Sequence, residues 1–168
     1  MEIRILSKSD AQVYQEVRLS ALRNNPEAFG STYEREVNVS LQEVAERIEA
    51  TAEKFVLGAF HNNGSLVGIV TFVREDSPKM SHKGNVFGMY VAPEGRGGGL
   101  GKLLMSELIK RAKCCEGLEQ INLTVVSDNS SAQKLYKSLG FEVYGLERNA
   151  LQFNGHYYDE ELMVLYLI

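Results

Sequence analysis

Five glycines and two basic residues lie close together between Gly95 and Lys102, where the chain reads GRGGGLGK. An apolar run, Val86–Val91, precedes this segment, and apolar residues at helical spacing follow it: Leu100, Leu103, Leu104 and Leu108. We therefore expect a strand, a glycine loop and a helix, in this order. The first turn of a helix has unpaired backbone N–H groups and partial positive charge, and glycines let that backbone approach a ligand closely. The segment predicts a phosphate or pyrophosphate site; the alternative is a flexible turn before a core helix.

The two common nucleotide-binding motifs do not fit this loop. In the Walker A pattern G-x-x-x-x-G-K-[ST], aligned on Gly101 and Lys102, the first glycine falls on Arg96. Leu103 then stands where the metal-binding hydroxyl belongs. The dinucleotide pattern G-x-G-x-x-G fails in every register. A nucleotide-dependent oxidoreductase or kinase is therefore the least favoured function.

A third pattern does fit the loop. Arg96–Gly101 matches [RQ]-x-x-G-x-[GA] and resembles the acetyl-CoA loop of the GNAT-type N-acetyltransferases. A second block, Asn129–Phe141, is similar to the family's N-x-x-A-x-x-[LF]-Y-x-x-x-G-F signature, with Tyr136 at its tyrosine. Both blocks occur in the order and at the separation of the family. The resemblance extends over most of the chain and is weakest in its first third.

The resemblance implies an acyltransferase that moves an acetyl group from acetyl-CoA to a primary amine of a small molecule, peptide or protein. It implies direct attack in a ternary complex, with Tyr136 as general acid and CoA as product. In the family, the N–H at the Met89 position faces the thioester oxygen, and the residue at the Val91 position pairs with the pantetheine arm. The resemblance implies cofactor binding by Met89, Tyr90, Val91, Arg96, Gly97, Gly98, Gly99, Leu100, Gly101, Lys102, Asn129 and Tyr136. From spacing alone, Met89 and Val91 fit a core strand, Tyr136 a core aromatic and Asn129 a helix cap.

A long irregular segment, Asn24–Val39, is the candidate for the acceptor side of the site. Long loops in a compact domain are often functional. Phe29, Tyr33 and Glu34 offer aromatic surface and negative charge, which suit an amine. The alternative is a connector whose aromatic side chains pack into the core.

No general base stands out in the sequence. Many members of the family place a glutamate in the central strand, but Val86–Val91 has no carboxylate. Tyr90, Glu34, Tyr157 and Asp159 are the remaining candidates, and the alternative is that the amine loses its proton to a chain of water molecules. A non-catalytic acyl-CoA-binding module on the same fold therefore stays open as the alternative function.

The periodic segments place these motifs in one α/β domain, residues 1–168, with a mixed sheet of about seven strands flanked by about four helices. The expected order is β-α-α-β-β-β-α-β-α-β-β, which is also the GNAT order. We expect strands at Glu2–Leu6, Phe55–Phe60, Leu66–Val73, Val86–Val91, Ile121–Val126 and His156–Leu167, and the runs Phe141–Gly145 and Leu151–Phe153 are strand-like. The long final strand suggests an edge where a second copy could pair, so a homodimer is possible.

Composition excludes several other classes. A net charge of −4 without a long basic run argues against a nucleic-acid binder. No apolar run is long enough to span a membrane, and the N-terminus does not read as a signal peptide, so a cytoplasmic protein is expected. Cys114 and Cys115 are sequence neighbours and form no disulfide framework. The three histidines have no metal-ligand spacing, and we expect no metal.

Overall fold

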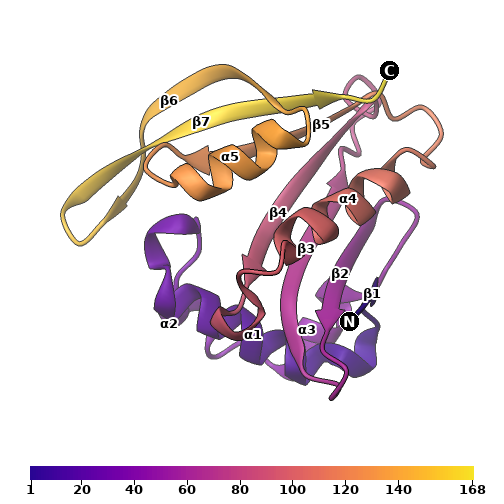
Figure 1. The fold of residues 1–168 in the computed structure, drawn as a ribbon, viewed down its shortest axis with the longest axis vertical. Coiled ribbons are helices and arrows are strands. Elements are labelled where there is room, and N and C mark those ends of the chain that lie inside the picture. Colours follow the sequence, from indigo (N-terminus) through magenta and orange to yellow (C-terminus); the bar gives the residue numbers. More distant parts are fainter.

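The computed structural model describes all residues 1–168, and its seven strands form one mixed sheet in the order β1-β2-β3-β4-β5-β7-β6 (Figure 1). The strands are β1 (Glu2–Ile5), β2 (Lys54–Phe60), β3 (Leu66–Arg74), β4 (Lys83–Val91), β5 (Gln120–Val126), β6 (Glu142–Phe153) and β7 (His156–Tyr166). Only β4 and β5 pair in parallel, as expected for two strands joined by a crossover helix. The predicted α/β class and strand number are confirmed.

Five α-helices cover the sheet: α1 (Ala11–Asn24), α2 (Tyr33–Glu36), α3 (Leu41–Ile48), α4 (Leu100–Ala112) and α5 (Ser130–Ser138). Helix α4 packs on β3 from one face, where Leu100 and Leu104 lie over Gly68. Helix α1 packs on the opposite face of β3, where Tyr14 meets Thr71. The core is therefore continuous through the β2–β4 part of the sheet. Its fully buried side chains include Leu57, Ile69, Phe72, Leu104, Met105 and Leu108.

One local expectation is wrong, and another is incomplete. The segment Asn24–Val39 is not irregular throughout, because it contains a 3-10 turn (Pro26–Ala28) and helix α2. Thr32 caps α2 by accepting a hydrogen bond from the Arg35 N–H, which supports a helix too short to show periodicity. The two strand-like runs, Phe141–Gly145 and Leu151–Phe153, are not interrupted but belong to one continuous strand, β6, because β7 pairs with it along its length across two bulges.

The sheet opens between its two parallel strands. β4 and β5 pair only where Lys83–Asn85 meet Gln120–Asn122, and beyond these three residue pairs they separate. On its other side β4 carries a bulge, in which Gly88 and Met89 together face Val70 of β3. Gly88 has a φ of +59°, a conformation that favours glycine. The bulge and the opening lie at the same level of β4.

An ion pair fixes the first strand to the start of α1. Both terminal nitrogens of Arg4 donate to Asp10 at 2.8 Å, and the Ser7 N–H also donates to this carboxylate at 2.8 Å. These hydrogen bonds lower the pKa of Asp10 to about 2, and those from Arg4 have the largest effect. A carboxyl group whose pKa is lowered by folding stabilises the fold above its unfolded pKa of 3.8, and this stabilisation is lost as the pH falls toward 2.

We expect the substitution Asp10→Asn to lower the free energy of unfolding by about 1 kcal/mol at pH 6, and by much less at pH 2. The full shift would correspond to about 2 kcal/mol, but the Arg4 side chain is 39% exposed, so solvent screening reduces it. Urea unfolding at both pH values measures the difference. Equal losses at pH 6 and pH 2 would mean that the carboxylate charge of Asp10 does not contribute.

Candidate functional site

The glycine loop leads directly from β4 into α4, as the sequence predicts. Gly97 and Gly99 have φ values of +87° and +73°, and Gly99 caps the helix. The first backbone bond of α4 runs from the Leu103 N–H to the Gly99 carbonyl (3.1 Å), so the N–H groups of residues 100–102 have no helical partner. A Cβ atom at Gly97, Gly98 or Gly99 would meet nothing within 4 Å. The loop therefore presents unpaired donors beside open space, the geometry of an anion site.

The two basic residues of the loop differ in their surroundings: one side chain contacts the end of β4, and the other is exposed. Arg96 folds back on the end of β4, where its Nε donates to the Val91 carbonyl at 2.9 Å and its Nη2 lies 3.5 Å from Asn25 Oδ1. Lys102 is exposed on the first turn of α4. Both residues place positive charge near the loop, and Arg96 also reaches the aromatic ring of Tyr90, 5.7 Å from its centroid.

A cavity of about 230 Å³, here called the splay cavity, fills the opening between β4 and β5. Most of the residues that line it are hydrophobic, although polar atoms are also exposed to the cavity, and α5 forms a further wall. Five of the residues that the sequence assigns to the cofactor line it: Met89, Val91, Gly101, Asn129 and Tyr136. The structure thus brings together residues that are up to 47 positions apart, from Met89 to Tyr136.

Tyr136 lies on the inner face of α5. Its side chain is 7% exposed and meets the Phe141 ring edge-on, with centroids 5.9 Å apart. Burial raises the pKa of Tyr136 to about 12, so its phenol is protonated at neutral pH. Asn129 caps the same helix, because its Oδ1 accepts a hydrogen bond from the Ala132 N–H at 3.2 Å. A buried proton donor therefore forms part of the wall of the splay cavity.

A second cavity of about 420 Å³, here called the mouth cavity, adjoins the first and shares Met89 and Phe29 with it. Its wall also includes two carboxylates, Glu27 and Asp128, and the ring of Tyr158. These residues come from the loop after α1, the end of β5 and strand β7. Arg96 lines the same cavity, so an ammonium group there would meet two carboxylates and one guanidinium close to the splay cavity.

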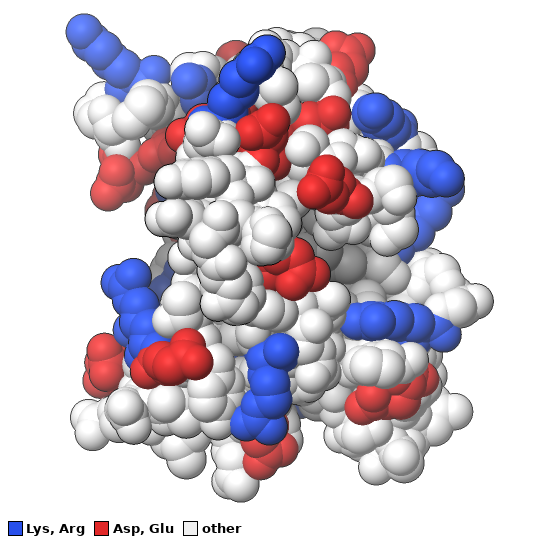
Figure 2. Space-filling model, turned by 90° about the vertical axis from the view of Figure 1, so that its left-hand side faces the viewer, with Lys and Arg blue, Asp and Glu red and all other residues white.

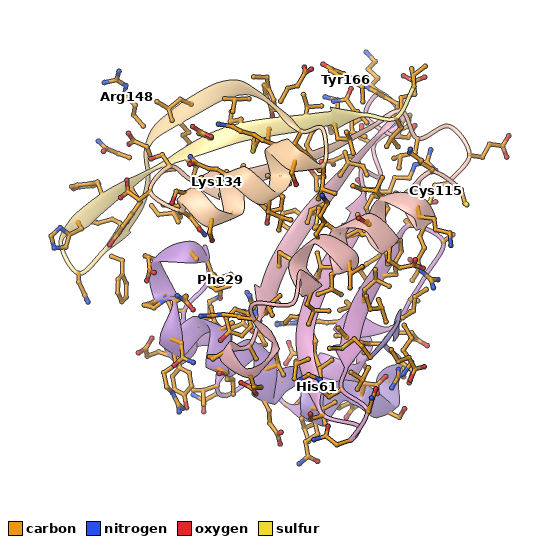
Figure 3. All side chains as sticks on the ribbon, in the orientation of Figure 1. Phe29, His61, Cys115, Lys134, Arg148 and Tyr166 are labelled. Atoms are coloured by element: carbon orange, nitrogen blue, oxygen red, sulfur yellow. The ribbon has the colours of Figure 1, made fainter.

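A third cavity of about 220 Å³, here called the loop cavity, contains all three residues that the sequence assigns to the acceptor. Phe29, Tyr33 and Glu34 line it together with the β6–β7 hairpin. Arg23 holds Tyr33 in place, since its Nη2 donates to the phenolic oxygen at 2.7 Å. Phe29 lines all three cavities, and Figure 3 shows it projecting from the loop toward the space below α5 and β5.

Sequence reasoning missed Glu27, Asp128 and Tyr158. None stands in a recognisable motif, and only the folded chain brings them to one cavity. The weaker candidates in the final strand lie elsewhere: Tyr157 is 61% exposed, and the Asp159 carboxylate accepts the Asn149 N–H at 2.8 Å in a bulge of β6. Figure 2 shows mixed charge on one face of the molecule, with acidic side chains gathered over its upper half.

Comparison with known proteins identifies the family. The model of the "Acetyltransferase (GNAT) family" matches residues 16–141, which is most of the chain and includes the glycine loop and Tyr136. An L-amino acid N-acetyltransferase of Escherichia coli is 34% identical over 101 residues, which are 60% of this chain and 62% of that protein. A mycothiol acetyltransferase of Rothia mucilaginosa is 25% identical over 160 residues, 88% of this chain and 43% of that protein. The chain thus spans less than two thirds of the length of both relatives.

Solved structures share the fold over its full length. An acetyltransferase of the GNAT family from Streptococcus pneumoniae superposes with a TM-score of 0.86 at 24% identity, covering 99% of both chains. A putative acetyltransferase of Salmonella typhimurium, solved with its cofactor acetyl-CoA, has a TM-score of 0.80 at 25% identity and covers 100% of this chain and 94% of its own. None of the helices of this chain has the length and apolar character needed to cross a membrane. The chain belongs to the acetyltransferase (GNAT) family, as its glycine loop and its Asn129–Phe141 block predict.

Proposed function

We propose that this protein transfers the acetyl group of acetyl-CoA to a primary amine of a small molecule, peptide or protein. The observation that carries the proposal is the splay cavity, which leads from the N-terminus of α4 to the phenol of Tyr136. A glycine loop with unpaired N–H groups at one end suits a pyrophosphate, and a buried proton donor at the other suits a leaving thiolate.

The residues present fit acetyl-CoA along the whole cavity. Gly97, Gly98 and Gly99 leave room for the pyrophosphate beside the N–H groups of residues 100–102. Beyond Asn85, the β4 edge that faces β5 has no ladder partner, and this edge would pair with the pantetheine arm at Val91. The Met89 N–H, at the bulge, would donate to the thioester oxygen and stabilise negative charge there. Acetyl-CoA supplies the activated acyl group in this arrangement.

Transfer then requires an amine in its neutral form next to the thioester carbon. Glu27 and Asp128 attract the ammonium form into the mouth cavity, and the amine loses its proton before attack. As the new C–N bond formed and the C–S bond broke, Tyr136 would give its proton to the sulfur. The nitrogen would release its surplus proton to solvent, and the phenol would take one back from solvent. No carboxylate of β4 takes part, because Lys83–Val91 contains none.

Acetyl-CoA should stabilise the fold, and NAD should not. A ligand that binds only the folded state adds about 2.7 kcal/mol at a hundred times its Kd, which raises Tm by about 5–10 °C in a domain of this size. A thermal-shift titration with acetyl-CoA, CoA, NAD and ATP in parallel measures this. An equal rise with NAD, or no rise with either CoA species, would contradict the assignment of the glycine loop.

A further inference from the structure

Two buried polar groups on the α1 side of β4 have no partner in the protein. The Nη1 of Arg18 and the hydroxyl of Tyr90 are both sealed from solvent and make no hydrogen bond. Tyr90 as a whole is 5% exposed. An unpaired buried polar group costs about 1–3 kcal/mol, and more if it carries charge. Such groups are therefore expected to gain a partner in another state of the protein.

Both groups flank the same side chain. The guanidinium of Arg18 lies over the ring of Phe29, 5.2 Å from its centroid, and Tyr90 meets that ring edge-on at 6.3 Å. Phe29 lines the splay, mouth and loop cavities, and the phenol of Tyr90 belongs to the wall of the mouth cavity. Phe29 thus contacts both donor side chains and also lines the cavities on the acceptor side of the site.

Arg18 also lies close to the bulge of β4. Its Nη1 would be 3.7 Å from a Cβ atom at Gly88, and Gly88 lines the splay cavity. Because Gly88 has no side chain, the guanidinium lies close to the backbone of the bulge, next to the Met89 N–H in sequence. None of the six ion pairs of the chain includes Arg18, so its charge has no counter-ion in the protein.

We propose that Arg18 and Tyr90 form a carboxylate-binding subsite for the acceptor, which is therefore an α-amino acid. This inference rests on the proposed acetyl transfer. A guanidinium and a phenolic hydroxyl are both donors at neutral pH and suit a carboxylate. Tyr90 already lines the mouth cavity, whereas Arg18 does not, so Phe29 would have to rotate about its side-chain bonds for a carboxylate to reach both groups. Glu27 and Asp128, on the same cavity, hold the ammonium, so the two charges of one zwitterion meet opposite charges.

The test compares acceptors that differ only in the carboxylate. The wild-type protein is assayed by thiol release with a panel of L-amino acids, the corresponding amino acid amides and the corresponding decarboxylated amines. We expect kcat/KM for the best amino acid to exceed that for its amide at least about tenfold, as for the loss of one charge-assisted hydrogen bond. Calorimetric titration of the same acceptors into the complex with CoA measures binding without turnover.

Two variants then assign the preference to the subsite. Arg18→Gln removes the charge, and Tyr90→Phe removes only the hydroxyl and keeps the ring that meets Phe29. Both should raise KM for amino acids about tenfold and leave KM for the amides unchanged. Arg18→Gln should also leave the Kd of acetyl-CoA unchanged. Arg148→Gln, on the exposed part of β6 far from Phe29, is the matched control (Figure 3). If Arg18→Gln does not fold, Tyr90→Phe alone decides.

The outcomes separate this inference from the proposed function. Acetylation of amides and simple amines with no preference for amino acids, or equal losses for both acceptors in the variants, would overturn the subsite and leave acetyl transfer intact. Absence of any carboxylate-dependent binding in the calorimetric titration would overturn it as well. Failure of acetyl-CoA itself to bind would contradict the proposed function instead.

Discussion

The substitution Tyr136→Phe should lower kcat about a hundredfold and leave the affinity for acetyl-CoA unchanged. General acid catalysis by a positioned side chain contributes about 10²–10⁴ to a rate. The variant keeps the ring that packs edge-on against Phe141, so the loss reports the hydroxyl rather than the shape of the core. Steady-state turnover and calorimetric titration of acetyl-CoA measure the two quantities. Tyr144→Phe, at an exposed position on β6, is the control for removal of a phenolic hydroxyl.

The pH dependence provides an independent check on the same residue. Tyr136 must be protonated to donate, and burial raises its pKa to about 12. Activity should therefore rise with pH as the acceptor amine loses its proton, with no descending limb below about pH 11. A kcat of the variant equal to that of the wild-type protein would show that the thiolate takes its proton from elsewhere. Binding of acetyl-CoA without turnover in either protein would favour the non-catalytic acyl-CoA-binding module.

The substitution Gly98→Asp should weaken acetyl-CoA binding about a hundredfold without unfolding the protein. A Cβ at Gly98 meets nothing within 4 Å and its φ is not positive, so the new side chain causes no strain. It places a carboxylate beside the proposed pyrophosphate site. Two like charges about 5 Å apart repel by about 3 kcal/mol at an effective dielectric constant of about 20, which corresponds to a factor of about a hundred in Kd. Calorimetric titration measures the loss.

Two controls separate charge from shape. Gly98→Ala adds the Cβ atom alone and should have a much smaller effect. S-acetylpantetheine lacks the pyrophosphate, so its affinity should be the same for the wild-type protein and for Gly98→Asp. An equal loss for acetyl-CoA and S-acetylpantetheine would mean that the loop does not hold the pyrophosphate.

The sequence is most informative where function depends on the backbone. The loop Gly95–Lys102 needs glycines at positive φ and unpaired N–H groups, and both requirements leave a visible pattern in the residue types. The turn between β6 and β7 is predictable for the same reason, since Asn154 and Gly155 both adopt positive φ. Local chemistry of this kind can be recognised without knowing the rest of the fold.

The acceptor side of the site, in contrast, cannot be recognised from local sequence patterns. Arg18 lies in the middle of an amphipathic helix, and nothing in its sequence neighbourhood distinguishes it from a surface arginine. Asp128 and Tyr158 reach the mouth cavity only because β5 and β7 are neighbours in the sheet. Helix α2 escaped prediction because four residues are too few for a helical period. These features depend on tertiary contacts, which no local pattern records.

The opening between β4 and β5 has a consequence for how this protein can change during evolution. A linear molecule that lies along the free edge of β4 would form hydrogen bonds with main-chain groups, as an added strand would. Main-chain recognition does not depend on which side chains the strand carries, so mutations can change these side chains with little effect on the affinity for that molecule. The side chains that surround the acceptor come from other segments, namely α1, the loop after it and the β6–β7 hairpin. The fold thus separates the main-chain edge that would bind the acyl donor from the side chains that surround the acceptor. Mutations in the second group can change which acceptor is used without altering the part of the site that holds the acyl donor.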